Sequence, residues 1–260
     1  MGDCELDRKD EETMELILDV WEGALDINEP LLLDNGIAGL IIRINDMNGG
    51  HHKDTNFDNQ WAQAVNFLRA PYFVYNPWVT GSANYQWLKS NLPSSGVTRL
   101  FVDIEVIKSG YPAATYADEV QAFMQLALAD YPRTAIYTGG WFLPIVAHWP
   151  GGDYWWARYP YTFYPDWREY WSWTSLWQAV NDYGFWPDQL HKCPGTVKLW
   201  QFTGDRLILP GCANRPIDIS MWNGNLASLQ NWWGSEKPEP VDKLAILWRE
   251  AEAHGWNLEP

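Results

Sequence analysis

The chain of 260 residues is short of cysteine, of basic side chains and of long apolar runs. Its 3 cysteines, Cys4, Cys193 and Cys212, do not have the spacing of a metal site. Cys193 and Cys212 could form a disulfide, but reduced thiols are the default expectation where nothing indicates an oxidising compartment. No segment is apolar over the length that a membrane-spanning helix needs. These absences argue against a metal protein, a disulfide scaffold and an integral membrane protein.

Basic residues are outnumbered, because 18 Lys and Arg stand against 33 Asp and Glu, for a formal net charge of -15. Such a surface repels the phosphates of nucleic acids and the headgroups of anionic lipids. We therefore expect no nucleic-acid partner and no membrane insertion, and a neutral or weakly charged ligand fits better.

Residues 1–14 form a charged N-terminal extension that lacks the basic start and the apolar stretch of a secretory signal peptide. We expect a protein that is cytoplasmic until it is released by lysis or by a partner, as a phage or prophage protein would be.

Aromatic residues are abundant, with 19 Trp and 13 Tyr. Most of them are expected in the core, but exposed aromatic faces also stack on sugar rings.

Short apolar runs of strand-like composition recur along the chain, with turns or helical segments between them. They are residues 16–20, 38–44, 72–75, 100–105, 134–138, 154–159, 197–202 and 217–220. Residues 57–68 and 120–128 each keep one apolar face, which predicts helices, and strands alternating with helices predict parallel pairing and a closed barrel. Residues 160–195 lack clean periodicity, and residues 206–211 indicate a turn or hairpin.

The predicted fold is α/β: an irregular TIM-like β/α barrel over residues 15–234, with about five β/α units and three further strands. Residues 235–260 read as a Pro-containing linker followed by a short amphipathic helix. Residues 241–254 are candidates for contact with a partner or a second copy of the chain, and packing on the chain's own barrel or on a copy is favoured.

Two carboxylates, Asp103 and Glu105, end the apolar run at residues 100–105. Residues i and i+2 of a strand point to the same side, with Cβ atoms about 6 to 7 Å apart. At that separation the charges disfavour each other, so one acid should keep its proton to higher pH. A protonated acid beside a carboxylate is the arrangement that glycoside hydrolysis uses.

Asp19 ends the first predicted strand, and Asp218 lies in the last one. Each of these acids alone is more often a turn cap than a catalytic group. Because a β/α barrel gathers its strand ends at one face, Asp19, Asp103, Glu105 and Asp218 together predict an active site there.

From about residue 16 to 233 the chain resembles glycoside hydrolase family 25, the Chalaropsis-type lysozymes. The matching pieces, in order along the chain, are Leu-Asp19-Val, Ile-Ile-Arg43, Val-Tyr75, Val-Asp103-Ile-Glu105, Ile-Tyr137-Thr, Trp156-Ala-Arg-Tyr159, Trp200-Gln201 and Ile-Asp218-Ile. The resemblance implies an irregular β/α barrel that hydrolyses the β-1,4 bond between N-acetylmuramic acid and N-acetylglucosamine in bacterial peptidoglycan, without a metal or an organic cofactor.

The resemblance also implies roles for the acids. Glu105 would be the general acid, and Asp103 would orient or stabilise the 2-acetamido group of the substrate. Asp19 and Asp218 would bind substrate and tune the pKa of Glu105, with an auxiliary base role open for either. Inversion and assisted retention both stay open, because side-chain rotamers move the carboxyl oxygens by about the difference between the two geometries.

Substrate contacts are implied for Arg43, Tyr75, Tyr137 and Tyr159, with Trp200 and Gln201 in the floor of the site. Each is also a reasonable packing residue, and for Trp200 packing in the core is favoured.

The chain departs from the family pattern in places that bear on glycan preference. Asp19 is followed by Val-Trp21-Glu22-Gly23 in place of the usual Ser and Gln-Gly, and Asn76 replaces a His. His51 and His52 lie in a Gly-containing loop, but no further ligands have matching spacing, so no metal site is expected.

Two rival interpretations remain: a non-catalytic barrel that binds cell-wall glycan, such as a phage structural component, and an interaction protein that acts through its C-terminal helix. The presence of all four acids argues against the first.

Overall fold

The computed structural model describes residues 14–24, 27–47, 50–106, 108–147, 149, 152–159, 192–209, 211–212 and 216–234, with residues 180, 182, 186 and 190. Residues 1–13 of the predicted N-terminal extension and the predicted helix over residues 241–254 lie outside the described residues, as does most of the segment 160–191. Met14, the last residue of the predicted extension, begins the first strand.

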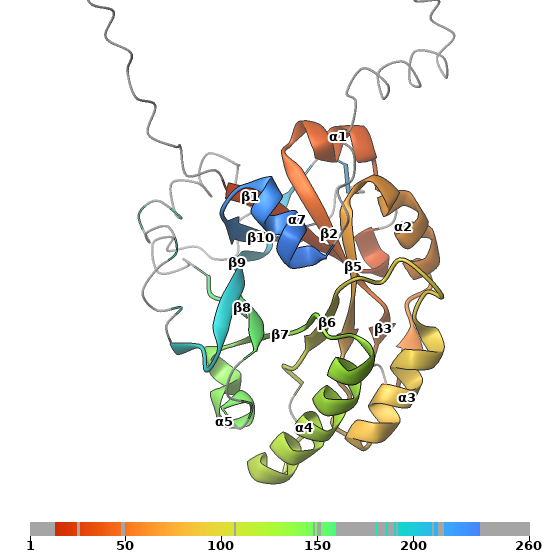
Figure 1. Cartoon of the computed structure of the whole chain (residues 1–260), viewed down its shortest axis with the longest axis vertical. Coiled ribbons are helices and arrows are strands. Elements are labelled where there is room, and N and C mark those ends of the chain that lie inside the picture. Colours follow the sequence, from red (N-terminus) through yellow and green to blue (C-terminus); the bar gives the residue numbers. More distant parts are fainter. Residues whose placement is uncertain are drawn as a thin grey trace, which may run out of the picture.

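Within the described residues, eight strands close a barrel in the order β1-β10-β9-β8-β7-β6-β5-β2 (Figure 1). They are β1 (Met14–Val20), β2 (Ile37–Arg43), β5 (Leu68–Val74), β6 (Leu100–Asp103), β7 (Thr134–Gly139), β8 (Asp153–Ala157), β9 (Thr196–Ile208) and β10 (Pro216–Asn223). Each predicted apolar run overlaps one of these strands, so the predicted barrel is confirmed. β6 ends at Asp103, two residues before the predicted end of that run.

Helices follow the first five parallel strands, as the predicted five β/α units require. They are α1 (Glu29–Asp34), α2 (Phe57–Gln63), α3 (Gly81–Asn91), α4 (Ala113–Asp130) and α5 (Leu143–Val146). The apolar periodicity did not predict α3, which carries polar residues around much of its surface and is capped at its N-terminus by the Thr80 side chain. A small separate sheet pairs β3 (Asn45–Asp46) with β4 (His52–Lys53).

The last strand, β10, runs antiparallel to both of its neighbours, β1 and β9, whereas the other six strand pairs of the barrel are parallel. The reversal follows from the short connection between β9 and β10, because a hairpin can join only antiparallel strands. It turns the N-terminal end of β10 towards the carboxyl ends of the parallel strands. We call that end of the barrel the mouth and the opposite end the base.

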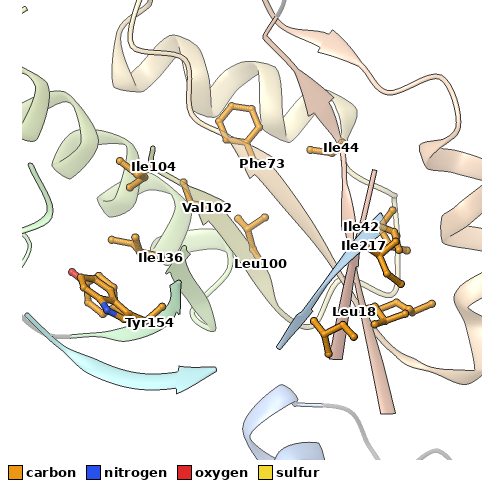
Figure 2. Packing of buried hydrophobic residues seen from close by; sticks show 14 of the residues in the cluster. Leu18, Ile42, Ile44, Phe73, Leu100, Val102, Ile104, Ile136, Tyr154 and Ile217 are labelled. Atoms are coloured by element: carbon orange, nitrogen blue, oxygen red, sulfur yellow. The ribbon is translucent and has the colours of Figure 1, made fainter. Parts of the chain in front are cut away.

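Side chains alternate between the two faces of the barrel wall, as the period of a strand requires. One set packs outwards between the strands and the helices, and Figure 2 shows members of it, including Leu18, Ile42, Phe73 and Val102. The other set fills the inside of the barrel and includes Ile17, Phe101 and Trp155. The acids Asp19 and Asp103 belong to the inward set, since each lies two residues after an inward apolar residue of its own strand.

A further helix, α7 (Leu226–Trp233), lies against the end of the barrel beside β1 and β10 (Figure 1). Its residues Leu229 and Trp233 belong to the inner apolar cluster, so the helix closes the base. No helix among the described residues combines the length and the apolar composition needed to cross a bilayer.

Candidate active site

A pocket of about 410 Å³ opens at the mouth of the barrel. It is lined by Asp19, Trp21, Arg43, Asp46, Met47, Tyr72, Val74, Asp103, Glu105, Val106, Ile217 and Asp218. All four acids that the sequence singled out lie in this lining, although they come from β1, from β10 and from the end of β6 with the residues that follow it.

Asp218 reaches the mouth because β10 is antiparallel. It lies near the beginning of β10 and pairs in register with Asp19, which is near the end of β1. Directly paired residues of neighbouring strands point to the same face of a sheet. Two carboxylates are therefore held side by side at one wall of the pocket.

Asp103 and Glu105 differ in their surroundings. Asp103 is 6% exposed, whereas Glu105 lies beyond the end of β6 and is exposed at the mouth. Burial raises the pKa of the Asp103 carboxyl well above its usual range, and the charges of Glu105 and Asp19 raise it further, while Arg43 opposes them. Partial enclosure by the protein also raises the pKa of Glu105. The pair therefore holds a proton at a higher pH than isolated carboxyls would.

Gln201 links the acids to two tyrosines. Its Nε2 atom donates to Oδ2 of Asp19 at 3.0 Å and to Oδ2 of Asp218 at 3.4 Å. Its Oε1 atom accepts the hydroxyl hydrogens of Tyr137 at 2.8 Å and of Tyr159 at 2.7 Å. One amide thus holds both carboxylates in place, and the two hydroxyls keep the amide in the orientation that directs its N–H groups at the acids.

Arg43 brings a cation to the pocket. Its Nε donates to Oδ2 of the buried Asp54 at 2.8 Å, and its guanidinium carbon lies 5.5 Å from the centroid of the Trp21 ring. The Trp21 ring in turn packs over Gly23, where a Cβ atom would come within 2.2 Å of it. The Gly of the altered first motif therefore makes room for an aromatic wall of the pocket.

Two predicted substrate contacts need correction. Tyr75 is fully buried on the outer side of the barrel wall, where its ring lies 5.8 Å from that of Tyr116 and 5.6 Å from that of Phe123. Trp200 is likewise fully buried on the outer side, as its favoured assignment to the core required, and its indole donates to the carbonyl of Arg158 at 2.6 Å. Neither side chain lines the pocket, because both occupy outward positions of the strand pattern.

Tyr72 is the tyrosine that lines the pocket in place of Tyr75. It shares the inward face with Val74, whereas Phe73 and Tyr75 point outwards. Burial raises the pKa of its hydroxyl well above its usual range, and Asp19 raises it further, so the hydroxyl keeps its proton. Tyr72 lies on the same face as Leu68 because the two occupy alternate positions of β5.

The histidine loop has a structural role. The ring of His51 stacks on Trp87 at 4.8 Å, its Nδ1 accepts from Asn45, and its Nε2 donates to Oδ1 of Asn84. Among the described residues, no group of three or more His, Cys, Asp or Glu side chains is arranged to hold a metal ion. Cys193 and Cys212 are free thiols.

The geometry supports acid–base chemistry on a neutral polar substrate. A solvent-open carboxyl with a raised pKa stands beside a buried one, and a second pair of acids is held ready to accept hydrogen bonds. Donation of a proton by one such acid, while neighbouring carboxylates stabilise positive charge, is the requirement of glycosidic bond cleavage.

Comparison with known proteins agrees with this chemistry. Residues 18–209 match Glycosyl hydrolases family 25. A comparison of the sequence with curated proteins found no match.

Several solved structures have the same fold. One is a family 25 glycosyl hydrolase from Bacillus anthracis, at 14% identity and a TM-score of 0.61, over 84% of this chain and 92% of that one. Another is the bacterial lysozyme from Streptomyces coelicolor, at 18% identity and a TM-score of 0.62, over 84% and 96%. The CTP1L endolysin matches at 13% identity and a TM-score of 0.55, over 93% and 80%. The family match spans most of the barrel, including Asp19, Asp103 and Glu105, and the chain belongs to glycosyl hydrolase family 25.

Proposed function

We propose that the protein is a peptidoglycan hydrolase that cleaves the β-1,4 bond between N-acetylmuramic acid and N-acetylglucosamine. The observation that carries this proposal is the pair Asp103 and Glu105 in the acid-lined pocket, one carboxyl buried and the other open to solvent, both with raised pKa values. Membership of the family and the likeness of the fold to a lysozyme and an endolysin support the same substrate class.

Glu105 acts as the general acid. It is the acid of the pair that solvent and a glycosidic oxygen can reach, and its raised pKa keeps it protonated further towards neutral pH. A general acid must hold its proton at the working pH and lie within hydrogen-bond reach of the leaving oxygen. Protonation of that oxygen lets the sugar ring leave without forming an alkoxide.

Asp103 orients the 2-acetamido group of the substrate. Its Oδ1 atom is buried and has no hydrogen-bond partner among the described residues, although the side chain lines the pocket. The N–H of a 2-acetamido group would supply the missing donor, and a carboxylate there would orient that group for attack on the anomeric carbon. Asp19 and Asp218, held by Gln201, bind the substrate, and the negative charge of Asp19 helps to keep the pKa of Asp103 raised.

We further propose that the protein is an endolysin-like enzyme. It would reach the cell wall after release by lysis or by a partner. The CTP1L endolysin and the spore cortex lytic enzyme SleM from Clostridium perfringens, a second structural neighbour, fit action on a cell wall.

Replacing Glu105 with Gln tests the proposal. We expect turnover of purified peptidoglycan to fall by about 10² to 10⁴, because Gln cannot donate a proton to the leaving oxygen. The free energy of unfolding should change by less than about 0.5 kcal/mol, since the side chain is exposed. The matched control is Asp34→Asn, on the exposed end of α1, which should leave turnover unchanged.

Mass spectrometry of the products identifies the bond. A new reducing N-acetylmuramic acid end supports a muramidase, whereas a reducing N-acetylglucosamine end would assign the protein to another specificity. Binding of glycan strands without any hydrolysis by the unaltered protein would reject the enzyme and favour a glycan-binding barrel.

A further inference from the structure

A second pocket, of about 190 Å³, lies beside the catalytic one and has no part in the proposed chemistry. Its walls come from the loop after β6, the beginning of α4 and the segment after β7. The side chains that matter for its chemistry are Lys108, Tyr111, Tyr116 and Trp141.

The two pockets are divided by the loop that carries Glu105. Glu105 and Val106 line the catalytic pocket, and Lys108 lines the second one. The hydroxyl of Tyr116 donates to the carbonyl of Val106 at 2.9 Å, which ties the wall of the second pocket to this loop. A substrate bound over Glu105 therefore has the second pocket within reach of a short branch.

The walls of the second pocket are mostly aromatic and aliphatic. Trp141 is 51% exposed, which is unusual for so large an apolar side chain. Its ring packs over Gly139, where a Cβ atom would come within 2.3 Å of it. The Trp141 ring can take this position in the wall of the pocket because Gly139 has no side chain.

Lys108 gives this apolar pocket a positive charge. Its Nζ lies 4.2 Å from the centroid of the Tyr111 ring. No carboxylate of the described residues forms an ion pair with it, whereas Arg43 at the catalytic pocket is paired with Asp54. In a chain with a net charge of -15, a cation of this kind next to an acid-lined mouth marks where an anionic part of the substrate can be held.

We propose that the second pocket binds the acidic stem peptide that branches from the glycan strand of peptidoglycan, with Lys108 pairing with a peptide carboxylate and Trp141 packing on an aliphatic side chain. The inference rests on the proposed function, because it names a further part of the same substrate. The catalytic pocket would repel a carboxylate, since five acids line it. A sugar ring fits the second pocket less well, because the Tyr116 hydroxyl is already engaged by Val106.

The test compares two substrates and a free ligand. Glycan strands that carry stem peptides are compared with the same strands after an amidase has removed the peptides. The free ligand is a synthetic stem peptide, acetyl-L-Ala-D-isoglutamate-L-Lys-D-Ala, and calorimetry measures its binding.

For Lys108→Met we expect kcat/KM on peptide-bearing strands to fall about tenfold, mainly through KM, and binding of the free peptide to weaken by a similar factor, because a charge-assisted contact is lost. Cleavage of peptide-free strands should stay within about twofold. Lys108→Arg keeps the charge and should retain most of the binding, and Lys89→Met on α3, whose partner is Asp130, serves as the control for removal of a lysine charge.

Gly139→Ala gives a second variant that leaves both binding side chains in the sequence. The new methyl group displaces the Trp141 ring, so the same selective loss on peptide-bearing strands is expected. Equal losses on both kinds of strand would overturn the proposal, because they indicate a sugar site or a disturbed Glu105 loop. Absence of any loss, or unchanged binding of the free peptide to Lys108→Met, would also overturn it. If the unaltered protein cleaves neither substrate, the proposed function fails, and binding of the free peptide still decides this inference.

Discussion

The mouth and the base of the barrel differ in the side chains that their strands point inwards: charged residues line the mouth, and apolar residues fill the base. At the base, Trp233 and Leu229 of α7 fill the opening and bury it. The base also contains Arg99, 2% exposed, whose guanidinium lies 3.5 Å from the centroid of the Trp232 ring and 3.8 Å from Asp153. Burial lowers the pKa of Arg99 to about 9. Its charge is thus enclosed against an aromatic ring and a carboxylate.

At the mouth the charged side chains line an open pocket, and acids outnumber basic residues there. Ile17 and Asp19 lie two residues apart on β1, as Phe101 and Asp103 do on β6, and in each case the apolar residue lies towards the base. On both strands, a residue that packs in the barrel interior is therefore only two positions away from an acid of the pocket. We expect changes at the base to alter stability and changes at the mouth to alter turnover, and the following variants test that division.

The largest effect is expected at the base, for Trp233→Ala. The indole is 1% exposed and donates to the carbonyl of Arg69 at 3.2 Å, so its removal leaves a cavity and breaks this hydrogen bond. The free energy of unfolding should fall by about 3 to 5 kcal/mol, measured by urea denaturation. Turnover per folded molecule should change little, because the site lies at the opposite end.

Trp78→Ala is the matched control for that loss. Trp78 is 55% exposed, so the same truncation should cost less than about 0.5 kcal/mol. A large fall in turnover for folded Trp233→Ala protein would show that the two ends are coupled and would break the comparison.

The next effect is expected at the mouth, for Asp103→Asn. Turnover should fall about a hundredfold, equivalent to roughly 2.7 kcal/mol, because Asn has only one of the two oxygens with which the Asp103 carboxyl can accept the N–H of the 2-acetamido group. Stability should not fall, and near neutral pH it should rise, since the variant no longer buries an ionisable carboxyl whose charge is disfavoured by Glu105 and Asp19.

The pH dependence of Asp103→Asn follows from the sign of the pKa shift. A carboxyl whose pKa is raised by folding contributes full stability below its unfolded pKa, about 3.9, and that contribution is lost as the pH rises through the folded pKa. The variant should therefore gain stability over the unaltered protein near pH 7, and the gain should vanish near pH 3. Equal differences at both pH values would reject the raised pKa.

The smallest effect is expected for Gln201→Met, which should lower both turnover and stability. Met has a similar size but cannot hold the carboxylates of Asp19 and Asp218 or accept the hydroxyls of Tyr137 and Tyr159. We expect kcat/KM to fall about tenfold and the free energy of unfolding to fall by about 1 to 3 kcal/mol, because Tyr137 loses a buried partner.

Gln201→Glu is the control that separates the two losses. It keeps the acceptors for the tyrosines but adds a negative charge next to Asp19, so turnover should fall more than with Met and the folded protein should become less stable as the pH rises. A Gln201→Met variant that loses stability but keeps full turnover would show that the amide only packs.

Much of this organisation could be predicted from local pattern. The eight strands were recognised by their apolar, β-branched composition, and the acids by their positions at the ends of strands or within the last strand. The helix α3 was missed because its stability comes from a cap and from packing on α4, and its sequence has little apolar periodicity. The family resemblance implied Tyr75, whereas Tyr72 is the tyrosine that faces inwards, because local sequence does not state which face of a strand turns inwards.

By itself, the sequence determined the alternation of strands and helices, the excess of negative charge, and the adjacency of Asp103 and Glu105, because these depend on neighbours within a few residues. Only the tertiary structure decided that β10 is reversed, that Asp218 lies beside Asp19, and that Gln201 joins them to Tyr137 and Tyr159. The physical reason is barrel closure: it sets the register of β1 against β10, strands that are about 200 residues apart in the chain, and so decides which side chains share the enclosed space.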